Sequence, residues 1–501
     1  MRSNATTVVK NATVLMASQL ITWALTLVLT VVLARYLGAT LVGEYTLASS
    51  LWTIMGVFIN FGMDTLLIKQ IARSPEQLPE LLGTTMIART ALFLLSCGAV
   101  ALYAYLAHFS PTTLVLVALL GVAQLVTQIY LATQAALQGI ELMEYVSIAG
   151  IISRVANTAL GIAVLLLGYG VYGIAIVTIV AMLVGLVLQY GVLWRRYPIR
   201  IAFNLQHMWS IMRAGLPYLA SSLGLVAYGQ VDVLVISSLI NTTQVGWYAS
   251  ASRLFGTTMF LPVILTTAAF PSLTRAYANA SDSVSRIIQK SFDLMLVLSV
   301  PLGLGLFVLA DPLVVLLYGA DFAPSGPVLA LMGLVLIPTY QNILLGQFLT
   351  STDRQNVWTV VILVATALTV PLDIVLVPWC QQQWSNGAIA GSLSFLITEV
   401  VMAAVGIRLL PKGSLGRSSI GVGLRVLAAG VVMAAISWWL RDIFIVVPIV
   451  CGAIVYGALI LLLRVVPAED LQLLKEVSLK ALGRLRRRGA NTVPAEGAKT
   501  P

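Results

Sequence analysis

The chain has 501 residues, of which 59% are apolar and only 10% are charged. A soluble globular domain carries roughly 25% charged residues, so this composition excludes an ordinary water-soluble protein and predicts a membrane protein. The formal net charge of +10 at pH 7 reflects how basic residues are distributed across the membrane. It does not indicate nucleic-acid binding.

Long apolar runs recur along most of the chain, and each can cross about 30 Å of hydrocarbon as an α-helix. They predict an all-α polytopic membrane protein with about fourteen transmembrane helices. Arg2 and Lys10 precede the first run as in a signal sequence, but the run is too long and lacks a cleavage site, so we expect it to remain as a span. The expected spans are 12–35, 43–68, 84–107, 112–137, 146–167, 171–194, 213–240, 246–271, 288–310, 327–350, 356–379, 387–410, 418–440 and 443–466.

Basic residues lie at the two ends of the chain and in the connections that follow even-numbered spans. Of the 29 lysines and arginines, only Arg35, Arg253 and Arg441 fall on the other side. Because basic connections stay on the cytoplasmic side, we expect both termini in the cytoplasm. The sequence therefore predicts a multi-pass protein of the plasma (cytoplasmic) membrane.

A short internal repeat divides the chain. Residues 34–51, ARYLGATLVGEYTLASSL, align with residues 238–254, SLINTTQVGWYASASRL, at a constant offset. Both copies fall where two spans meet, which an internal duplication explains. We therefore expect two six-helix lobes related by an axis along the membrane normal. The expected divisions are an N-lobe at 1–211, a C-lobe at 212–410, two further helices at 411–466 and a basic cytoplasmic tail at 467–501.

The sequence offers few groups for catalysis. No lysine follows a glycine, so the phosphate-binding GK[ST] signature is absent. The chain has only two histidines, and its three cysteines lie far apart, which excludes a histidine-rich metal site and a disulfide framework. We expect no catalytic residue, metal or cofactor, and we expect any energy that the protein uses to come from an H⁺ or Na⁺ gradient or from the membrane potential.

Charged residues inside the apolar runs are the main functional candidates, because charge is costly to bury in a membrane. Asp232 and Arg253 both lie about 12 Å deep on neighbouring antiparallel spans, so we expect them to face each other. In the functional interpretation, Arg253 binds an anion in a water-filled cavity and Asp232 is its counter-ion or a proton carrier. In the alternative, the two form a structural ion pair that fixes the register of the helices.

Five further charged residues are candidates. Arg154 lies about 13 Å from the inner side of span five, where it can receive a phosphate from the cytoplasm. Glu399 and Asp373 are candidate carriers of H⁺ or Na⁺, and for all three the alternative is pairing within the bundle. Arg35 and Glu44 bracket the first outer turn, where we favour a capping pair over substrate binding by Arg35 or ion coupling by Glu44.

Two other features are expected to be structural. Asp64, near Lys69, is expected to be a neutralised charge at a helix end. Prolines inside the apolar spans of the second lobe favour kinks, which serve either bending during transport or static packing of bent helices. These prolines are Pro262, Pro301, Pro338 and Pro371.

Four motifs resemble, in order, those of the polysaccharide flippases of the multidrug, oligosaccharidyl-lipid and polysaccharide exporter superfamily, whose fold is MATE-like. They are the first copy of the repeat, NFGMDTLLIKQIAR at 60–73, the stretch at 215–255 that contains the second copy, and ADPLVVLLYGADFAPSGPVLALM at 310–332. With the expected spans, they cover nearly the whole chain.

The resemblance implies two six-helix lobes in a V, plus two extra C-terminal helices. It also implies that the protein moves a polyprenyl-diphosphate-linked oligosaccharide across the bilayer to the outer leaflet by alternating access, for cell-surface polysaccharide biosynthesis. Asp232 and Arg253 then belong to cavity-lining helices, a polysaccharide polymerase is a candidate partner, and a monomer suffices because two lobes enclose the site. The alternatives are a drug or cation antiporter, a flippase for the peptidoglycan precursor, and a membrane enzyme acting on lipid-linked sugars.

Overall fold

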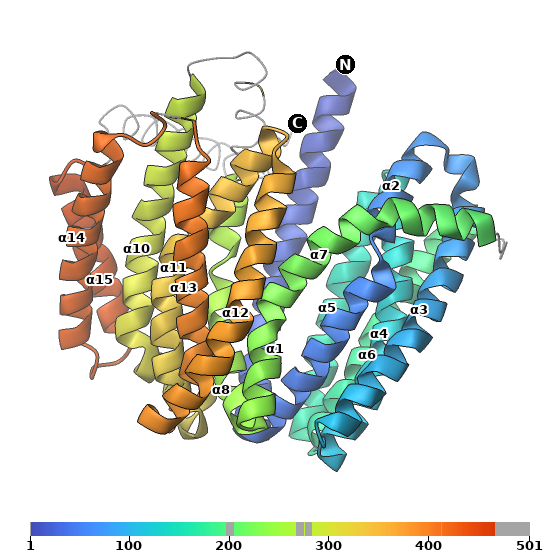
Figure 1. Ribbon diagram of the computed structural model, residues 1–501, viewed down its shortest axis with the longest axis horizontal. Coiled ribbons are helices and arrows are strands. Elements are labelled where there is room, and N and C mark those ends of the chain that lie inside the picture. Colours follow the sequence, from blue (N-terminus) through green and yellow to red (C-terminus); the bar gives the residue numbers. More distant parts are fainter. Residues whose placement is uncertain (1, 197–204, 267–274, 276–282, 412, 466–501) are drawn as a thin grey trace, which may run out of the picture.

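The computed structural model describes residues 2–196, 205–266, 275, 283–411 and 413–465 (Figure 1). All regular structure in these residues is helical, as the sequence predicts. The first half contains α1 (Arg2–Asn60), α2 (Met63–Arg73), η1 (Pro75–Gln77), α3 (Leu78–Leu106), α4 (Pro111–Gly139), α5 (Met143–Leu166) and α6 (Gly170–Arg196).

The second half contains α7 (Leu205–Leu239), α8 (Thr242–Thr257), α10 (Ser283–Tyr318), η2 (Ala320–Phe322), α11 (Ser325–Ser351), α12 (Gln355–Trp384), α13 (Ala388–Arg408), α14 (Arg417–Trp439) and α15 (Val446–Leu462). In the described residues, 11 helical segments are long and apolar enough to cross a membrane. α1 supplies two passes, and the shorter α8 and α15 supply one each, so the prediction of about fourteen spans is confirmed.

The helix breaks follow from local backbone chemistry. α1 turns at Gly38, which adopts φ 73° and ψ 173°, a conformation that glycine reaches without a steric penalty. α4 begins after Ser110, whose hydroxyl accepts a hydrogen bond from the Thr113 amide at 3.1 Å. α8 begins in the same way after Asn241, whose side chain accepts from the Gln244 amide at 3.0 Å.

The helices form two groups that meet at one end and diverge toward the other, as the expected V shape requires (Figure 1). α1 begins at the diverging end, called the N-terminal end here, and the other is called the closed end. α14 and α15 lie at the outer edge of the C-terminal group. They pack on α10 through Val300, Val426, Met433 and Tyr456.

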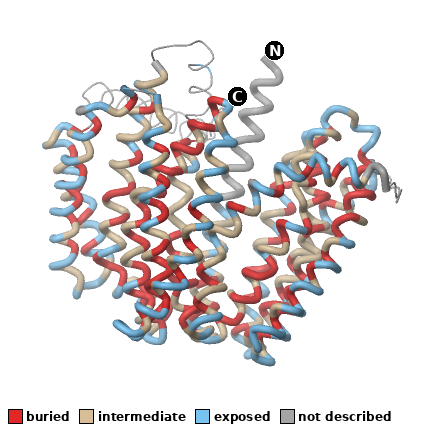
Figure 2. The backbone as a smooth tube through the Cα atoms, in the orientation of Figure 1, coloured by how far each residue is buried: buried red, intermediate tan, exposed pale blue. Residues whose placement is uncertain are grey.

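Buried residues gather inside the two groups of helices, and the outer helices carry many exposed ones (Figure 2). Large apolar side chains are among the most exposed, including Leu95 at 72%, Val375 at 68% and Trp439 at 82%. A water-soluble protein rarely exposes so much continuous apolar surface, so these outer faces are suited to contact lipid.

Glycines bring the backbones of α1 and α8 into contact at the closed end. A Cβ atom on Gly43 would lie 1.7 Å from the carbonyl oxygen of Thr242, and one on Gly246 would lie 2.0 Å from that of Ala39. The hydroxyl groups of Thr40 and Thr243 lie 2.9 Å apart, and these two residues are separated by 203 positions. Gly43 and Gly246 have the same separation, so equivalent residues of the repeat contact each other, which supports the internal duplication.

α7 lies beside both groups of helices (Figure 1). Near its N-terminal end, a Cβ atom on Gly215 would lie 2.2 Å from the carbonyl oxygen of Phe61, which belongs to the α1–α2 break. Lys69 of α2 donates a hydrogen bond to the Tyr218 hydroxyl at 2.5 Å. Toward the closed end, α7 packs on α12. The lobe boundary at 211 and 212 stays a prediction.

Helices continue through the prolines named in the sequence. Pro301, Pro338 and Pro371 lie inside α10, α11 and α12, and Pro262 lies in the helical residues 260–266. Each proline removes one backbone hydrogen bond, which makes its helix easier to bend. Their contribution to movement stays a prediction.

Replacing Gly43 by alanine is expected to destabilise the protein, because the new methyl group would overlap the Thr242 carbonyl in a backbone that cannot move aside easily. Overpacking of this kind costs about 1–3 kcal/mol. The thermal unfolding midpoint of the purified protein measures the change. Gly457→Ala on α15 is the control, since its added Cβ meets nothing within 4 Å. Equal midpoints for the two variants would contradict the close contact.

Candidate functional site

Two carboxyl groups meet in the interior of the C-terminal group of helices. Asp232 of α7 and Asp373 of α12 are 3% and 0% exposed, and they are close enough to interact electrostatically. Asp232 accepts a hydrogen bond from the Tyr248 hydroxyl, and Asp373 accepts one from the Ser394 hydroxyl. One oxygen of each carboxyl group is buried without a hydrogen-bond donor in the described residues.

Two ionised carboxylates cannot remain in contact in a site without water unless a cation lies between them. Protonation of at least one carboxyl group, or a cation between the two, would remove this repulsion. A glycine makes room for the carboxyl pair: a Cβ atom on Gly391 would lie 2.7 Å from the Tyr248 ring and 3.3 Å from the Asp232 Cβ. The sequence named both aspartates as separate candidates and did not predict that they meet.

Glu399 forms a second buried carboxylate in the same group of helices. Its side chain accepts hydrogen bonds from the Asn342 amide at 2.7 Å and from the Tyr228 hydroxyl at 3.1 Å. The Tyr228 hydroxyl also lies 2.9 Å from that of Thr398. Tyr228 and Asp232 are four residues apart on α7, hence one helical turn. The Glu399 carboxylate thus accepts its hydrogen bonds from uncharged donors. An ion-coupling role for Glu399 stays a prediction.

The expected pairing of Asp232 with Arg253 is wrong. Asp232 contacts Tyr248 and Asp373, whereas Arg253 donates a hydrogen bond to the Thr46 hydroxyl of α1 at 3.3 Å. No ion pair involves Arg253 in the described part of the chain. The two residues have similar depth on adjacent helices, but they point in different directions. Arg253 therefore connects α8 to α1 and keeps donors available for an anion.

Arg35 and Glu44 do not pair with each other. Arg35 donates from Nε to the carbonyl oxygen of Leu317 at 2.7 Å and from Nη2 to that of Leu316. These carbonyls belong to the last turn of α10, where unsatisfied acceptors and the helix dipole favour a cation. Glu44 accepts a hydrogen bond from Ser110 at 3.1 Å. Each residue thus stabilises a helix end at the closed end, and their roles in substrate binding and ion coupling stay predictions.

Arg154 lies in a polar cavity of about 320 Å³ in the N-terminal group of helices. The cavity is formed by α1, α4, α5 and α6. The guanidinium group makes no ion pair or hydrogen bond with another described residue, although the Tyr130 and Tyr45 hydroxyls are close enough to interact with it electrostatically. An uncompensated cation inside a polar cavity is suited to bind an anion.

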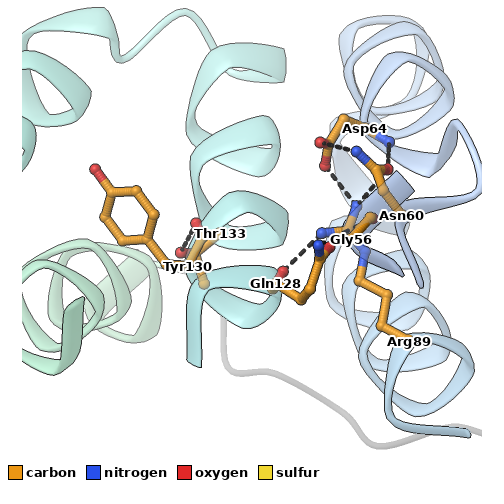
Figure 3. Close-up of polar contacts among 7 residues, drawn as sticks. All are labelled: Gly56, Asn60, Asp64, Arg89, Gln128, Tyr130 and Thr133. Carbon is orange, nitrogen blue, oxygen red and sulfur yellow. Dashed lines mark hydrogen bonds and ion pairs between the residues drawn. The ribbon is translucent and has the colours of Figure 1, made fainter. Parts of the chain in front are cut away.

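A fully buried arginine, which the sequence analysis placed among the inner basic residues, organises the break between α1 and α2 (Figure 3). Arg89 is 0% exposed and forms an ion pair with Asp64 at 2.5 Å. It also donates to the Asn60 side chain at 3.1 Å and to the Gln128 carbonyl oxygen at 2.6 Å. Asp64 is therefore neutralised by Arg89 and not by the nearby Lys69.

This network sits beside two consecutive residues with left-handed backbone, Phe61 with φ 48° and Gly62 with φ 74°. The network holds the chain where it leaves one helix and enters the next. Sequence spacing gave no signal for the pair, because Asp64 and Arg89 lie on different helices, 25 residues apart.

No group of three or more histidine, cysteine, aspartate or glutamate side chains in the described residues is arranged to hold a metal ion. The three cysteines, Cys97, Cys380 and Cys451, are free thiols. The site therefore consists of the carboxyl pair in one group of helices and of arginines in and beside the other. Together with the two-lobed helical fold, this arrangement defines a polytopic membrane protein with charged groups inside its helix bundle.

Residues 8–277 match the family model described as polysaccharide biosynthesis protein. This match covers more than half of the chain, which therefore belongs to that family. Residues 229–456 also match the model of the lipid II flippase MurJ. The family resemblance seen in the sequence motifs is confirmed.

Two curated relatives are similar over part of their length. One is the probable low-salt glycan biosynthesis flippase Agl15 of Haloferax volcanii, 22% identical over 184 residues, which are 36% of this chain and 39% of that protein. The other is the succinoglycan biosynthesis transport protein ExoT of Rhizobium meliloti, 26% identical over 185 residues, which are 36% of this chain and 37% of that protein. The matched part thus spans less than half of each relative.

Solved structures share the fold. The lipid II flippase MurJ in an inward closed conformation aligns with a TM-score of 0.70 at 14% identity, covering 90% of this chain and 99% of that one. A multidrug resistance MATE transporter of the MOP superfamily in an inward-facing conformation aligns with a TM-score of 0.65 at 14% identity, covering 77% of this chain and 92% of that one. The MATE-like fold is therefore confirmed.

Removing the buried arginine is expected to destabilise the protein strongly. Arg89→Ala leaves Asp64 without its counter-charge and removes three hydrogen bonds, at a cost of about 3–5 kcal/mol. The exposed Arg73→Ala on α2 is the control, with an expected change within about 0.5 kcal/mol. Thermal unfolding midpoints measure both. The double variant Arg89→Met, Asp64→Leu should recover part of the loss. Equal midpoints for Arg89→Ala and Arg73→Ala would contradict a structural role for the network.

Proposed function

We propose that the protein is a flippase that moves a polyprenyl-diphosphate-linked oligosaccharide from the cytoplasmic to the outer leaflet by alternating access, for cell-surface polysaccharide biosynthesis. Membership in the polysaccharide biosynthesis family and similarity to two proteins named as glycan flippase and succinoglycan transport protein support the proposal. The observation that carries it is the pair of arginines without carboxylate partners, Arg154 and Arg253, beside an interface between two lobes.

The charge of such a substrate fits these arginines. A diphosphate presents only hydrogen-bond acceptors and a negative charge, so it needs donors such as guanidinium groups. The prenyl tail is as apolar as the outer helix faces and can stay in the bilayer while the headgroup crosses. This arrangement needs no bond to be broken, so the proposed role is transport without catalysis.

The carboxyl pair supplies a means of coupling transport to an ion gradient. Asp232 and Asp373 can take up one H⁺ or one Na⁺, and the occupied and empty states differ by one buried charge. Such a difference in charge can favour one arrangement of the helices over another. We therefore propose that an H⁺ or Na⁺ gradient, acting at this pair, drives the cycle.

Orientation completes the proposal. We infer from the distribution of basic residues that the N-terminal end of the molecule faces the cytoplasm. The lobes then diverge toward the side on which the lipid-linked sugar is made, and the closed end faces outward. We further propose that the protein acts as a monomer and that a polysaccharide polymerase receives the product.

The match of residues 229–456 to the lipid II flippase model favours a second candidate substrate of the same class. This candidate is the lipid-linked peptidoglycan precursor, which also carries a diphosphate. A drug or cation antiporter is less suited, because Arg154 would repel a cationic drug in the N-lobe cavity.

Proteoliposomes containing the purified protein are expected to translocate a fluorescent short-chain polyprenyl-diphosphate oligosaccharide. Arg253→Ala should reduce the rate about tenfold, because a hydrogen bond between charged partners is worth about 1.5–3 kcal/mol. Arg73→Ala, which removes an exposed arginine, is the control at matched amounts of folded protein. Faster translocation of a peptidoglycan precursor would favour the second substrate. Drug efflux without translocation of either lipid would overturn the proposal.

Neutralising the carboxyl pair is expected to uncouple transport from its driving gradient. Asp232→Asn and Asp373→Asn each remove a group that can release H⁺ or bind Na⁺ with its charge. We expect one of the two imposed gradients, H⁺ or Na⁺, to accelerate translocation by the wild-type protein. Translocation by each variant should no longer respond to that gradient. Asp353→Asn is the control, since Asp353 is exposed in a turn. A gradient response that survives in both pair variants would exclude coupling at this site.

A further inference from the structure

The polar cavity of the N-lobe has a composition that a diphosphate does not require. Besides Arg154, its lining includes the amide side chains of Gln134, Gln138 and Asn157 and the ring of Tyr130. None of these amides is hydrogen bonded to another described side chain or backbone group through its own side chain. Amides both donate and accept hydrogen bonds, as sugar hydroxyl groups do. A phosphate oxygen would leave the amide carbonyls unpaired.

A serine in the same wall also lacks a partner. Ser147 is 5% exposed, and its hydroxyl makes no hydrogen bond in the described residues. A buried hydroxyl without a partner costs free energy, which a bound polar ligand would recover. The cavity thus contains an unpaired cation, three free amides and an unpaired buried hydroxyl.

The location of the cavity gives access from the N-terminal end. Gln138 lies in the last turn of α4 at this end, and Arg154 lies 11 residues along α5 from its first residue, hence about 16 Å deeper. Tyr130 projects from the side of α4 opposite Gln128 and the Arg89 network (Figure 3). α4 therefore separates the structural ion pair of Arg89 from the cavity.

We propose that this cavity is a subsite for a sugar bearing a carboxylate, within the lipid-linked oligosaccharide, and that Arg154 determines specificity for that charge. The assignment rests on the proposed flippase function and adds the class of sugar. Arg154 is the one ionisable cation among the described lining residues. One guanidinium group matches one carboxylate in charge and in its planar two-donor geometry. A diphosphate would bring a second negative charge that nothing in this lining balances.

The diphosphate then has a separate partner. Tyr45 is close enough to interact electrostatically with both Arg154 and Arg253, and its hydroxyl lies 3.5 Å from that of Thr178 on α6. Both arginines are thus within electrostatic range of the same tyrosine. In this assignment Arg253 binds the diphosphate, and Arg154 binds the acidic sugar further along the chain.

The test compares three short-chain polyprenyl-diphosphate disaccharides that differ only in the outer sugar, which is glucuronic acid, its neutral C6 amide, or glucose. Wild-type protein in proteoliposomes is expected to translocate the acid about tenfold faster than the amide, the difference that about 1.4 kcal/mol of binding provides. Arg154→Gln should bring the ratio of the two rates close to one. Arg154→Lys should keep part of the preference, and Arg73→Gln should keep all of it.

A second measurement separates this proposal from the proposed function. Saturation-transfer NMR detects binding of the soluble methyl glycosides of the acidic and neutral disaccharides, which lack both diphosphate and lipid, to the protein in nanodiscs. Selective binding of the acid that Arg154→Gln abolishes supports the subsite. Equal binding of both sugars, or Arg154→Gln lowering both translocation rates in proportion, overturns it. If none of the lipids is translocated, the flippase proposal is overturned. The NMR result by itself then decides whether the cavity binds the acidic sugar.

Discussion

The contact between α1 and α8 at the closed end is the constraint on which the rest of the structure depends. Gly43 and Gly246 allow the two helices to approach until the backbone of each meets the other, and the hydroxyls of Thr40 and Thr243 join them. Without hydrophobic driving force between helices in lipid, close packing of small residues is what holds such a pair together. Because the two halves of the contact come from equivalent residues of a repeat, the lobes join at one end and diverge at the other.

The duplicated backbone carries different chemistry in its two copies. Tyr248 donates to Asp232 of the carboxyl pair, whereas its counterpart Tyr45 is close enough to Arg154 and to Arg253 to interact with both electrostatically. The offset of 203 places Leu29 at the position equivalent to Asp232. Similar helices thus place a buried carboxyl group at one position and an apolar side chain at its equivalent.

The sequence predicted the membrane spans and the V-shaped fold because these depend on apolar run length and on motif order, which are local properties. It also located Asp232, Asp373, Arg154 and Arg253 as buried charges. It did not predict which of these side chains contact each other. Depth along a helix follows from 1.5 Å per residue, but direction changes by about 100° per residue, so a small error in rotation turned Asp232 away from Arg253.

A single sequence also gives no signal for contacts between helices that are far apart along the chain. The ion pair between Arg89 and Asp64, and the meeting of Asp232 with Asp373, depend on how helices pack, and packing is set by small residues such as Gly391. Gly391 belongs to a short glycine pattern at 387–391 that is typical of close helix approach. The pattern does not indicate which helix or which side chain Gly391 approaches.

α8 connects the three functional parts of the molecule. Within eight residues it contains Gly246 at the contact with α1, Tyr248 at the carboxyl pair and Arg253 at the arginine site. A helix of this length moves as a rigid body, because each residue is held by backbone hydrogen bonds to the next turn. A displacement of Tyr248 would therefore also displace Gly246 and Arg253. In the proposed mechanism, one helix thus links the ion site and the substrate site to the contact between the lobes.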